Sequence, residues 1–158
     1  VASLVVVALA STPANQADEL GAIALCAEAD LTVPSDWKIE SFEEVSLRLP
    51  RDFNAVVPTV ISDHGGQSWT NGRITISLTK GFYRLESFAG LPGRRCRAEV
   101  RGRPVLLITE IRANAASILA WDADVRAGGY HVTARASSTN ADDLSRLRLI
   151  VLGVKHSR

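Results

Sequence analysis

Apolar and polar side chains alternate with a period of two along much of this chain from residue 44 onward. Residues 44–49 place valine or leucine at every second position, and Pro50 ends the run. Such a pattern is typical of a β-strand that buries one face. The alternation returns in separate segments as far as residue 136. We therefore expect an antiparallel sheet of about six or seven strands, connected as a meander.

The strongest local pattern is an Asn-Gly pair at residues 71–72, which stands between the alternating runs QSWT and RITISLTK. An Asn-Gly pair in this position is typical of a tight β-hairpin. A two-residue turn places Trp69 opposite Ile74. The indole is then expected on the core face, together with Ile76 and Leu78.

A second hairpin is predicted by ILAWDADV and YHVTARA, which flank a turn containing two glycines. Pairing Val125 with Tyr130 turns Asp122 and Asp124 toward the face that carries Arg135. Acidic and basic side chains on neighbouring strands stabilise each other when they share a face. We therefore expect these two aspartates to compensate the arginines of the sheet.

The chain closes with TNADDLSRLRLIVLGVKH, in which apolar residues recur at helical spacing. Thr139 or Asn140 can cap the start of this helix, and Lys155 and His156 are expected to complement the negative end of its dipole. The apolar stripe comprises Leu144, Leu147, Ile150, Val151 and Val154. The helix should pack on one face of the sheet, and an N-terminal helix or segment should cover the other. The expected fold class is therefore α+β.

The first ten residues, VASLVVVALA, are apolar apart from one serine, and no charge occurs before Asp18. This run is shorter than the roughly 20 residues that span a bilayer, but it matches the apolar part of a secretory signal. No positive segment precedes it and the chain contains no methionine, so we expect the true start to lie upstream. Residues 1–17 are thus predicted to be an export signal, and residues 18–158 a single domain that is periplasmic or extracellular. The alternative is a buried N-terminal strand.

Cys26 and Cys96 are the two cysteines of the chain. In an oxidising compartment an even number of cysteines favours pairing. Closing a loop of about 70 residues would stabilise the fold by roughly 4 kcal/mol. The alternative is that Cys96 is a free thiol that packs as a small apolar residue.

The stretch RRCRAEVRGR carries five arginines in ten residues, although the formal net charge of the chain is only +1. Strand alternation separates Arg95, Arg97 and Arg101 from the core-facing side, which explains their spacing but not their number. One interpretation is an ordinary solvated strand face. The other is a binding patch for an anionic component of the cell envelope, such as a phospholipid or a polysaccharide. That patch would comprise Arg94, Arg95, Arg97, Arg101 and Arg103.

Two loop segments carry the other candidate site residues. Phe82, Tyr83 and Phe88 lie in the glycine-containing connection GFYRLESFAGLPG, and loops often carry binding residues. The alternative is that these aromatic side chains close the end of the sheet. Asp63 and His64 precede a Gly-Gly pair and could act as an acid–base pair, although Asp in such a segment more commonly stabilises a turn.

Several kinds of chemistry have no motif in this chain. The three histidines, His64, His131 and His156, do not have the spacing of metal ligands. A phosphate-binding glycine loop and a nucleophile elbow are also absent from the sequence. We therefore expect neither a metal nor a cofactor.

The order of several segments resembles a known family. PSDW, FEEVSLRLPRDF, GRITISL, GFY, a cysteine before RGRPV and a final helix ending in LGVKH follow one another over residues 34–156. This succession resembles exported bacterial proteins with a PsbP-like fold, related to the accessory subunit of the oxygen-evolving photosystem and to Ran-binding proteins. The resemblance implies an antiparallel sheet flanked by helices and the role of an accessory module rather than an enzyme. It transfers no functional residue, because no functional motif is matched.

These observations favour an exported, non-catalytic accessory or binding module of the cell envelope. Its partner would be a protein or an anionic envelope component, and no transmembrane span is expected in the mature chain. Nucleic acid is not expected as a partner, because no aromatic residues are interleaved with the arginines for base stacking. The alternative is a small envelope hydrolase that uses Asp63 and His64.

Overall fold

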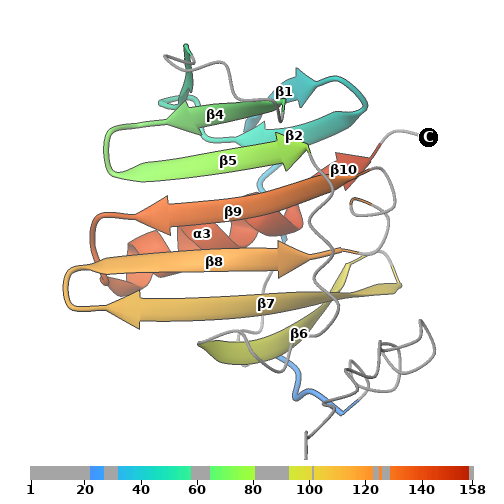
Figure 1. Cartoon of the computed structure of the whole chain (residues 1–158), viewed down its shortest axis with the longest axis vertical. Helices are drawn as coiled ribbons and strands as arrows, with labels where there is room; N and C mark the ends of the chain where they lie inside the picture. The colour runs from blue at the N-terminus through green and yellow to red at the C-terminus, as the bar shows by residue number, and fades with distance from the viewer. Residues whose placement is uncertain are drawn as a thin grey trace, which may run out of the picture.

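The computed structural model describes residues 22–26, 32–57, 65–80, 93–100, 102–122, 125 and 129–156. Its strands form two sheets (Figure 1). The large sheet has seven strands: β3 (Asn54–Val56), β4 (Gly66–Thr70), β5 (Ile74–Lys80), β6 (Arg94–Val100), β7 (Arg103–Arg112), β8 (Ala115–Trp121) and β9 (Tyr130–Ala136). The small sheet has three strands: β1 (Lys38–Phe42), β2 (Val45–Leu49) and β10 (Lys155–His156).

The large sheet joins two antiparallel meanders. Its strand order is β3-β4-β5-β9-β8-β7-β6, so β5 pairs with β9 in the middle of the sheet. With the C-terminal helix packed against this sheet, the α+β class and the antiparallel sheet are confirmed. The small sheet is an addition that the alternation pattern did not predict.

The C-terminal helix α3 (Ala141–Leu152) begins as expected, because Asn140 caps it by accepting a hydrogen bond from the backbone N–H of Asp143 at 2.8 Å. The helix packs on β8, β9, β5 and β2. The expected role of Lys155 and His156 is wrong. These two residues leave the helix and form β10, where they pair with Ser46 and Val45 of β2.

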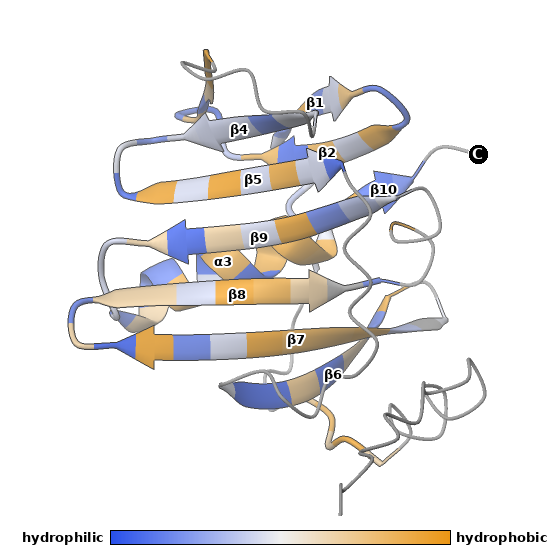
Figure 2. Cartoon of the chain, in the orientation of Figure 1, coloured by the Kyte–Doolittle hydropathy of each residue, from blue (hydrophilic) through white to orange (hydrophobic). Residues whose placement is uncertain are grey.

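One apolar core lies between the large sheet, α3 and the small sheet. We call the sheet face that contacts this core the inner face, and the opposite one the outer face. Hydropathy alternates accordingly along β5 and β9 (Figure 2). The core combines large buried side chains of β2, the loop after it, β4, β5 and α3: Val45, Leu47, Leu49, Phe53, Trp69, Ile74, Ile76, Leu78, Leu147, Ile150 and Val151.

The Asn-Gly hairpin is confirmed, but its register differs from the expectation by two residues. Trp69 lies opposite Ile76, and Thr70 lies opposite Thr75. The side chain of Asn71 closes the longer turn, because its Oδ1 accepts hydrogen bonds from the backbone N–H groups of Arg73 and Ile74 at 3.0 and 2.8 Å. A shift of two residues keeps every side chain on its face. The core positions predicted for this hairpin are therefore confirmed.

In the second hairpin, the facing predicted for β9 is confirmed, because Arg135 lies on the outer face, whereas the facing predicted for β8 is wrong. Ala120 lies opposite Val132, so the even-numbered residues of β8 point to the core. Asp122 follows the end of the strand and is buried, and its Oδ1 accepts a hydrogen bond from the backbone N–H of Val125 at 3.4 Å. The outer face of β8 therefore offers Ser117 and Leu119, and Asp122 is not beside Arg135. Residue 124 lies outside the described residues.

A disulfide joins Cys26 and Cys96, as one of the two interpretations predicted. Next to it, the backbone of residues 24–26 pairs with β6: the N–H of Cys26 donates to the carbonyl of Arg97, and the N–H of Arg97 donates to the carbonyl of Ala24, both at 2.9 Å. The predicted export signal and the predicted N-terminal cover fall mainly on residues 1–21, outside the described residues. Within the described ranges, no helix is long and apolar enough to cross a membrane.

Candidate binding site on the outer face of the large sheet

The residues on the outer face of the large sheet change from mainly polar to partly apolar from one side of the sheet to the other. Because opposite residues of paired strands share a face, the register defines rows of neighbouring side chains. One row is Thr70, Thr75, Arg135, Ser117 and Glu110. The next is Ser68, Ser77, Thr133, Leu119, Ile108 and Arg95. Hydroxyl groups dominate over β4, β5 and β9, whereas apolar residues are present toward β7.

The hydroxyl-rich part of this face is hollowed. One hollow of about 370 Å³ is lined by residues of β5, β8 and β9: Thr75, Ser77, Ser117, Ile118, Leu119, Thr133, Ala134 and Arg135. A second hollow of about 330 Å³ shares Ser117 and Arg135 with the first and extends to Glu110 and Arg112. We call these two hollows together the polar trough. No described helix or strand lies over it.

Some hydroxyl groups near the trough already have partners. The hydroxyls of Ser68 and Ser77 lie 2.9 Å apart, and Thr75 donates to the hydroxyl of Thr70 at 3.1 Å. By contrast, the hydroxyls of Ser117 and Thr133 make no hydrogen bond within the described part of the chain. Both flank Arg135, one directly across the strand pair and one two residues along β9.

Arg135 is exposed, and its guanidinium makes no hydrogen bond or ion pair with any residue that the structure describes. The acid in its row, Glu110, lies two strands away and pairs with Arg112, with 2.5 Å between Oε1 and Nε. Asp122, which was expected to compensate Arg135, is buried instead. The positive charge at the centre of the trough is therefore not neutralised by the described acids.

No known protein family, curated protein or solved structure matches this chain. The resemblance to PsbP-like proteins therefore stays a prediction.

The predicted arginine patch is only partly described. Arg94 is exposed at the start of β6, whereas Arg95 and Arg97 are half-buried on the outer side of that strand. Nε of Arg97 lies 3.5 Å from Oε1 of Glu99. Arg101 and the side chain of Arg103 lie outside the described residues. The described arginines thus share a strand, but two of them are engaged with other groups.

The remaining candidates cannot be placed. Asp63, His64, Phe82, Tyr83 and Phe88 all lie outside the described residues. The acid–base and aromatic interpretations of these loops stay predictions. Among the described residues, no group of three or more His, Cys, Asp or Glu side chains is arranged to hold a metal ion.

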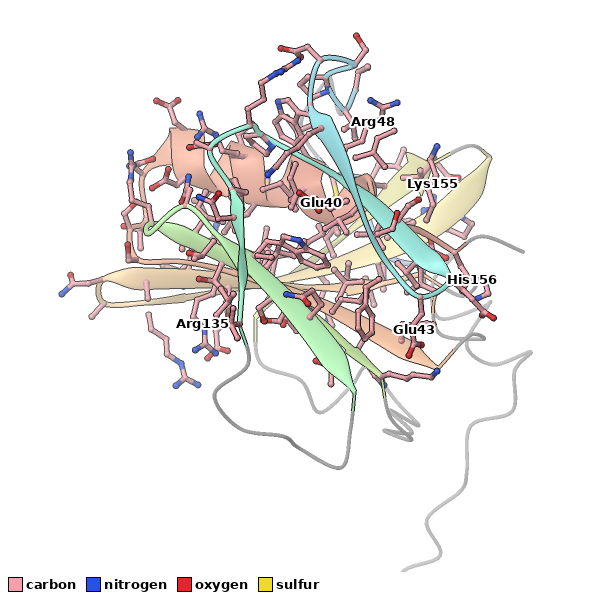
Figure 3. The ribbon with its side chains drawn as sticks, turned by 90° about the horizontal axis from the view of Figure 1, so that it is seen from above. Glu40, Glu43, Arg48, Arg135, Lys155 and His156 are labelled. Carbon is pink, nitrogen blue, oxygen red and sulfur yellow. A yellow bond between two sulfur atoms is a disulfide. The ribbon has the colours of Figure 1, made fainter. Side chains whose placement is uncertain are left out.

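A second polar cluster lies where the small sheet meets the end of the large sheet. Oε2 of Glu43 accepts a hydrogen bond from the Tyr130 hydroxyl at 2.5 Å and lies 2.7 Å from Nζ of Lys80. Nε2 of His156 lies 3.2 Å from Oε2 of Glu44. Figure 3 shows Glu43 and His156 near each other, on the side of the view away from Arg135. Glu43 has a left-handed backbone with φ of 50°, an uncommon conformation for a residue with a side chain.

The ionisation of this cluster argues against a catalytic role. The hydrogen bond from Lys80 holds the pKa of Glu43 below its usual range, and the same bond raises the pKa of Lys80. Burial, followed by the bond to Glu43, raises the pKa of Tyr130. A base or nucleophile needs a pKa shifted toward neutrality. All three shifts instead stabilise the charge states that these groups have at neutral pH. The contacts of Glu43 with Lys80 and Tyr130 join the small sheet to the large one.

Proposed function

We propose that the protein is an exported, non-catalytic binding module of the cell envelope, and that it binds its partner at the polar trough. The observation that carries this proposal is the unneutralised charge of Arg135, which lines a hollow of about 370 Å³ together with the hydroxyl-bearing residues Ser117 and Thr133. The inner face of the same sheet is filled by the core. The outer face is thus the side of the sheet that a partner can reach at this hollow.

The disulfide supports export. Structural disulfides form and persist in oxidising compartments and are rare in the cytosol of most organisms. Cys26 and Cys96 are 70 residues apart and tie residues 24–26 to an edge strand of the large sheet. The apolar residues at the beginning of the sequence support the same location.

The chemistry of the trough supports binding rather than catalysis. A serine nucleophile requires a base in hydrogen-bond contact. Ser117 makes no hydrogen bond to a histidine or a carboxylate within the described ranges. The lining instead offers donors: one guanidinium and several hydroxyl groups. Such a surface can hold an acceptor-rich partner.

Site-specific photocrosslinking in living cells tests this proposal. A photoreactive amino acid at Thr133, which is exposed in the trough, should crosslink the protein to an envelope component. The matched control is the same amino acid at Ser145, an exposed position of α3 on the other side of the molecule. A specific product from position 133 alone is expected. Equal products from both positions, or a product from position 145 alone, would overturn the proposed binding face.

A further inference from the structure

We propose that the polar trough is a phosphodiester site, in which Arg135, Ser117 and Thr133 bind the phosphate oxygens. This inference rests on the proposed function, since it names the chemical group that the binding face takes. The three residues come from adjacent strands. Arg135 and Thr133 are on β9, and Ser117 lies directly opposite Arg135 on β8.

The register brings the three donors to one place. Residues directly opposite each other on an antiparallel pair have Cβ atoms about 5 Å apart, and residues two apart on one strand share a face. Arg135 and Ser117 are such an opposite pair, and Thr133 is two residues from Arg135. All three line the same hollow. An anion placed over Arg135 can therefore be contacted from both β8 and β9.

The number of donors favours phosphate over carboxylate. A carboxylate has only two oxygens, and a guanidinium can bind both of them in one plane, so the two hydroxyls would have to share these oxygens with it. A phosphate group presents its oxygens in several directions. The guanidinium can take two of them, and the hydroxyls of Ser117 and Thr133 can donate to the remaining acceptor sites. Each of the three side chains then has a partner.

The charge of the site favours a diester. Among the described residues that line the hollow, Arg135 is the single cation. In the adjoining hollow Arg112 is paired with Glu110, so that pair adds little net charge. A phosphodiester carries one negative charge and therefore matches one guanidinium.

The shape of the hollow fits an ester rather than a free ion. Its volume of about 370 Å³ exceeds what one phosphate group needs, and hollows of roughly 300–1,000 Å³ hold small organic ligands. Leu119 contributes an apolar side chain beside the donors. The alcohol parts of the ester can lie against it. A lipid headgroup and a soluble glycerophosphodiester share this chemistry.

The test is an NMR titration of the full chain with glycerophosphoglycerol, the soluble diester that corresponds to a phosphatidylglycerol headgroup. The amide signals of residues 117, 133 and 135 should shift together. Arg135→Gln should weaken binding by about 10- to 100-fold, because a charge-assisted hydrogen bond contributes roughly 1.5–3 kcal/mol. Arg135→Lys, which keeps the charge but loses the planar fork, should also weaken it.

Arg146→Gln is the matched control, since it removes the same charge from an exposed position of α3. Equal weakening by Arg146→Gln and Arg135→Gln would overturn the proposal, because it would mean that only net charge matters. Binding unaffected by Arg135→Gln, in a variant whose spectrum shows the native fold, would also overturn it.

Vesicles distinguish the two sources of the diester. Binding to phosphatidylglycerol vesicles but not to phosphatidylcholine vesicles, with loss in Arg135→Gln, supports a lipid headgroup. Binding of the soluble ester alone supports a soluble ligand. If neither probe binds while Thr133 still crosslinks to a partner, the phosphodiester site is refuted and the binding face stands. If the crosslink fails as well, both proposals fall.

Discussion

At the scale of single residues, a charged side chain on the inner side of the large sheet and one on its outer side differ in burial and in their partners. On the inner side, the carboxylate of Asp143 is buried and has partners, since it accepts hydrogen bonds from Ser138 at 2.5 Å and from Arg73 at 2.8 Å. On the outer side, Arg135 is exposed and has none among the described residues. Asp143 therefore stabilises the fold, whereas Arg135 is available to a ligand.

Asp143 makes the stability of the protein depend on pH. The hydrogen bond from Ser138, with that from Arg73, lowers its pKa below the ordinary value of 3.8. A group with a lowered pKa contributes stability above its ordinary pKa, and this contribution is lost as the pH falls through the folded-state pKa. Asp143→Asn should reduce the free energy of unfolding at pH 7 by about 1–3 kcal/mol.

The deficit of Asp143→Asn should begin to shrink as the pH falls below 3.8 and should vanish below the folded-state pKa, where the carboxylate of the folded wild type is protonated too. Chemical denaturation at several pH values measures it. Asp142→Asn is the matched control, because Asp142 is the exposed neighbour in the same helical turn. A deficit that does not change with pH, or one equally large in Asp142→Asn, would refute this role of Asp143.

At the scale of elements, the large alternating strands were predictable. In β2 and β5 every second residue is valine, leucine or isoleucine, and polar residues stand between them. Only one facing of such a strand buries the apolar residues and leaves the polar residues on the other side. The helix α3 was predictable as well, because the capping residue Asn140 and the apolar stripe at helical spacing both indicate a helix in this segment.

The facing of β8 was not predictable from alternation. Its sequence, AASILAW, has apolar residues on both faces, so either register can bury an apolar set. The structure places Ala116, Ile118 and Ala120 on the side of the helix, where small side chains allow close packing. The candidate site depended on this choice. Arg135 was correctly expected on the outer face. Asp122 was wrongly expected beside it, so the sequence did not predict that the charge of Arg135 lacks an acidic partner among the described residues.

The small sheet was missed because two of its three strands carry weak patterns, so the partners of β2 could not be predicted. β1 mixes charged and apolar residues with intermediate burial, and β10 has only two residues. The cluster of Glu43, Lys80 and Tyr130 was missed as well, because it joins residues up to 87 positions apart. Spacing along the chain carries no information on such contacts.

The strand β6 is held to the N-terminal part of the chain by the disulfide. Replacing both cysteines with serine should lower the free energy of unfolding by about 4 kcal/mol, because a loop of about 70 residues is no longer closed in the unfolded chain. Denaturant unfolding of the oxidised wild type and the double variant measures this difference. Reduced wild type is the control and should match the variant. An unchanged denaturation midpoint after reduction would show that the bond contributes nothing.

At the scale of the whole molecule, the core lies on one face of the large sheet and the polar trough on the other. The helix α3 and the small sheet cover the inner face of the large sheet, and the apolar residues of all three form one core (Figure 1). The polar trough is on the opposite side, where the hydroxyl rows of β5, β8 and β9 are accessible. We propose that the protein binds the cell envelope through this trough, in which Arg135 supplies the positive charge.

The most direct measurement of that claim is the fraction of purified protein that sediments with isolated envelopes, for wild type, Arg135→Glu and Arg146→Glu. Both variants change the net charge equally, but only one changes the trough. Arg135→Glu should lose most of the binding, Arg146→Glu should bind like wild type, and high salt should weaken wild-type binding. Equal binding by Arg135→Glu and wild type, or equal loss in both variants, would contradict the account.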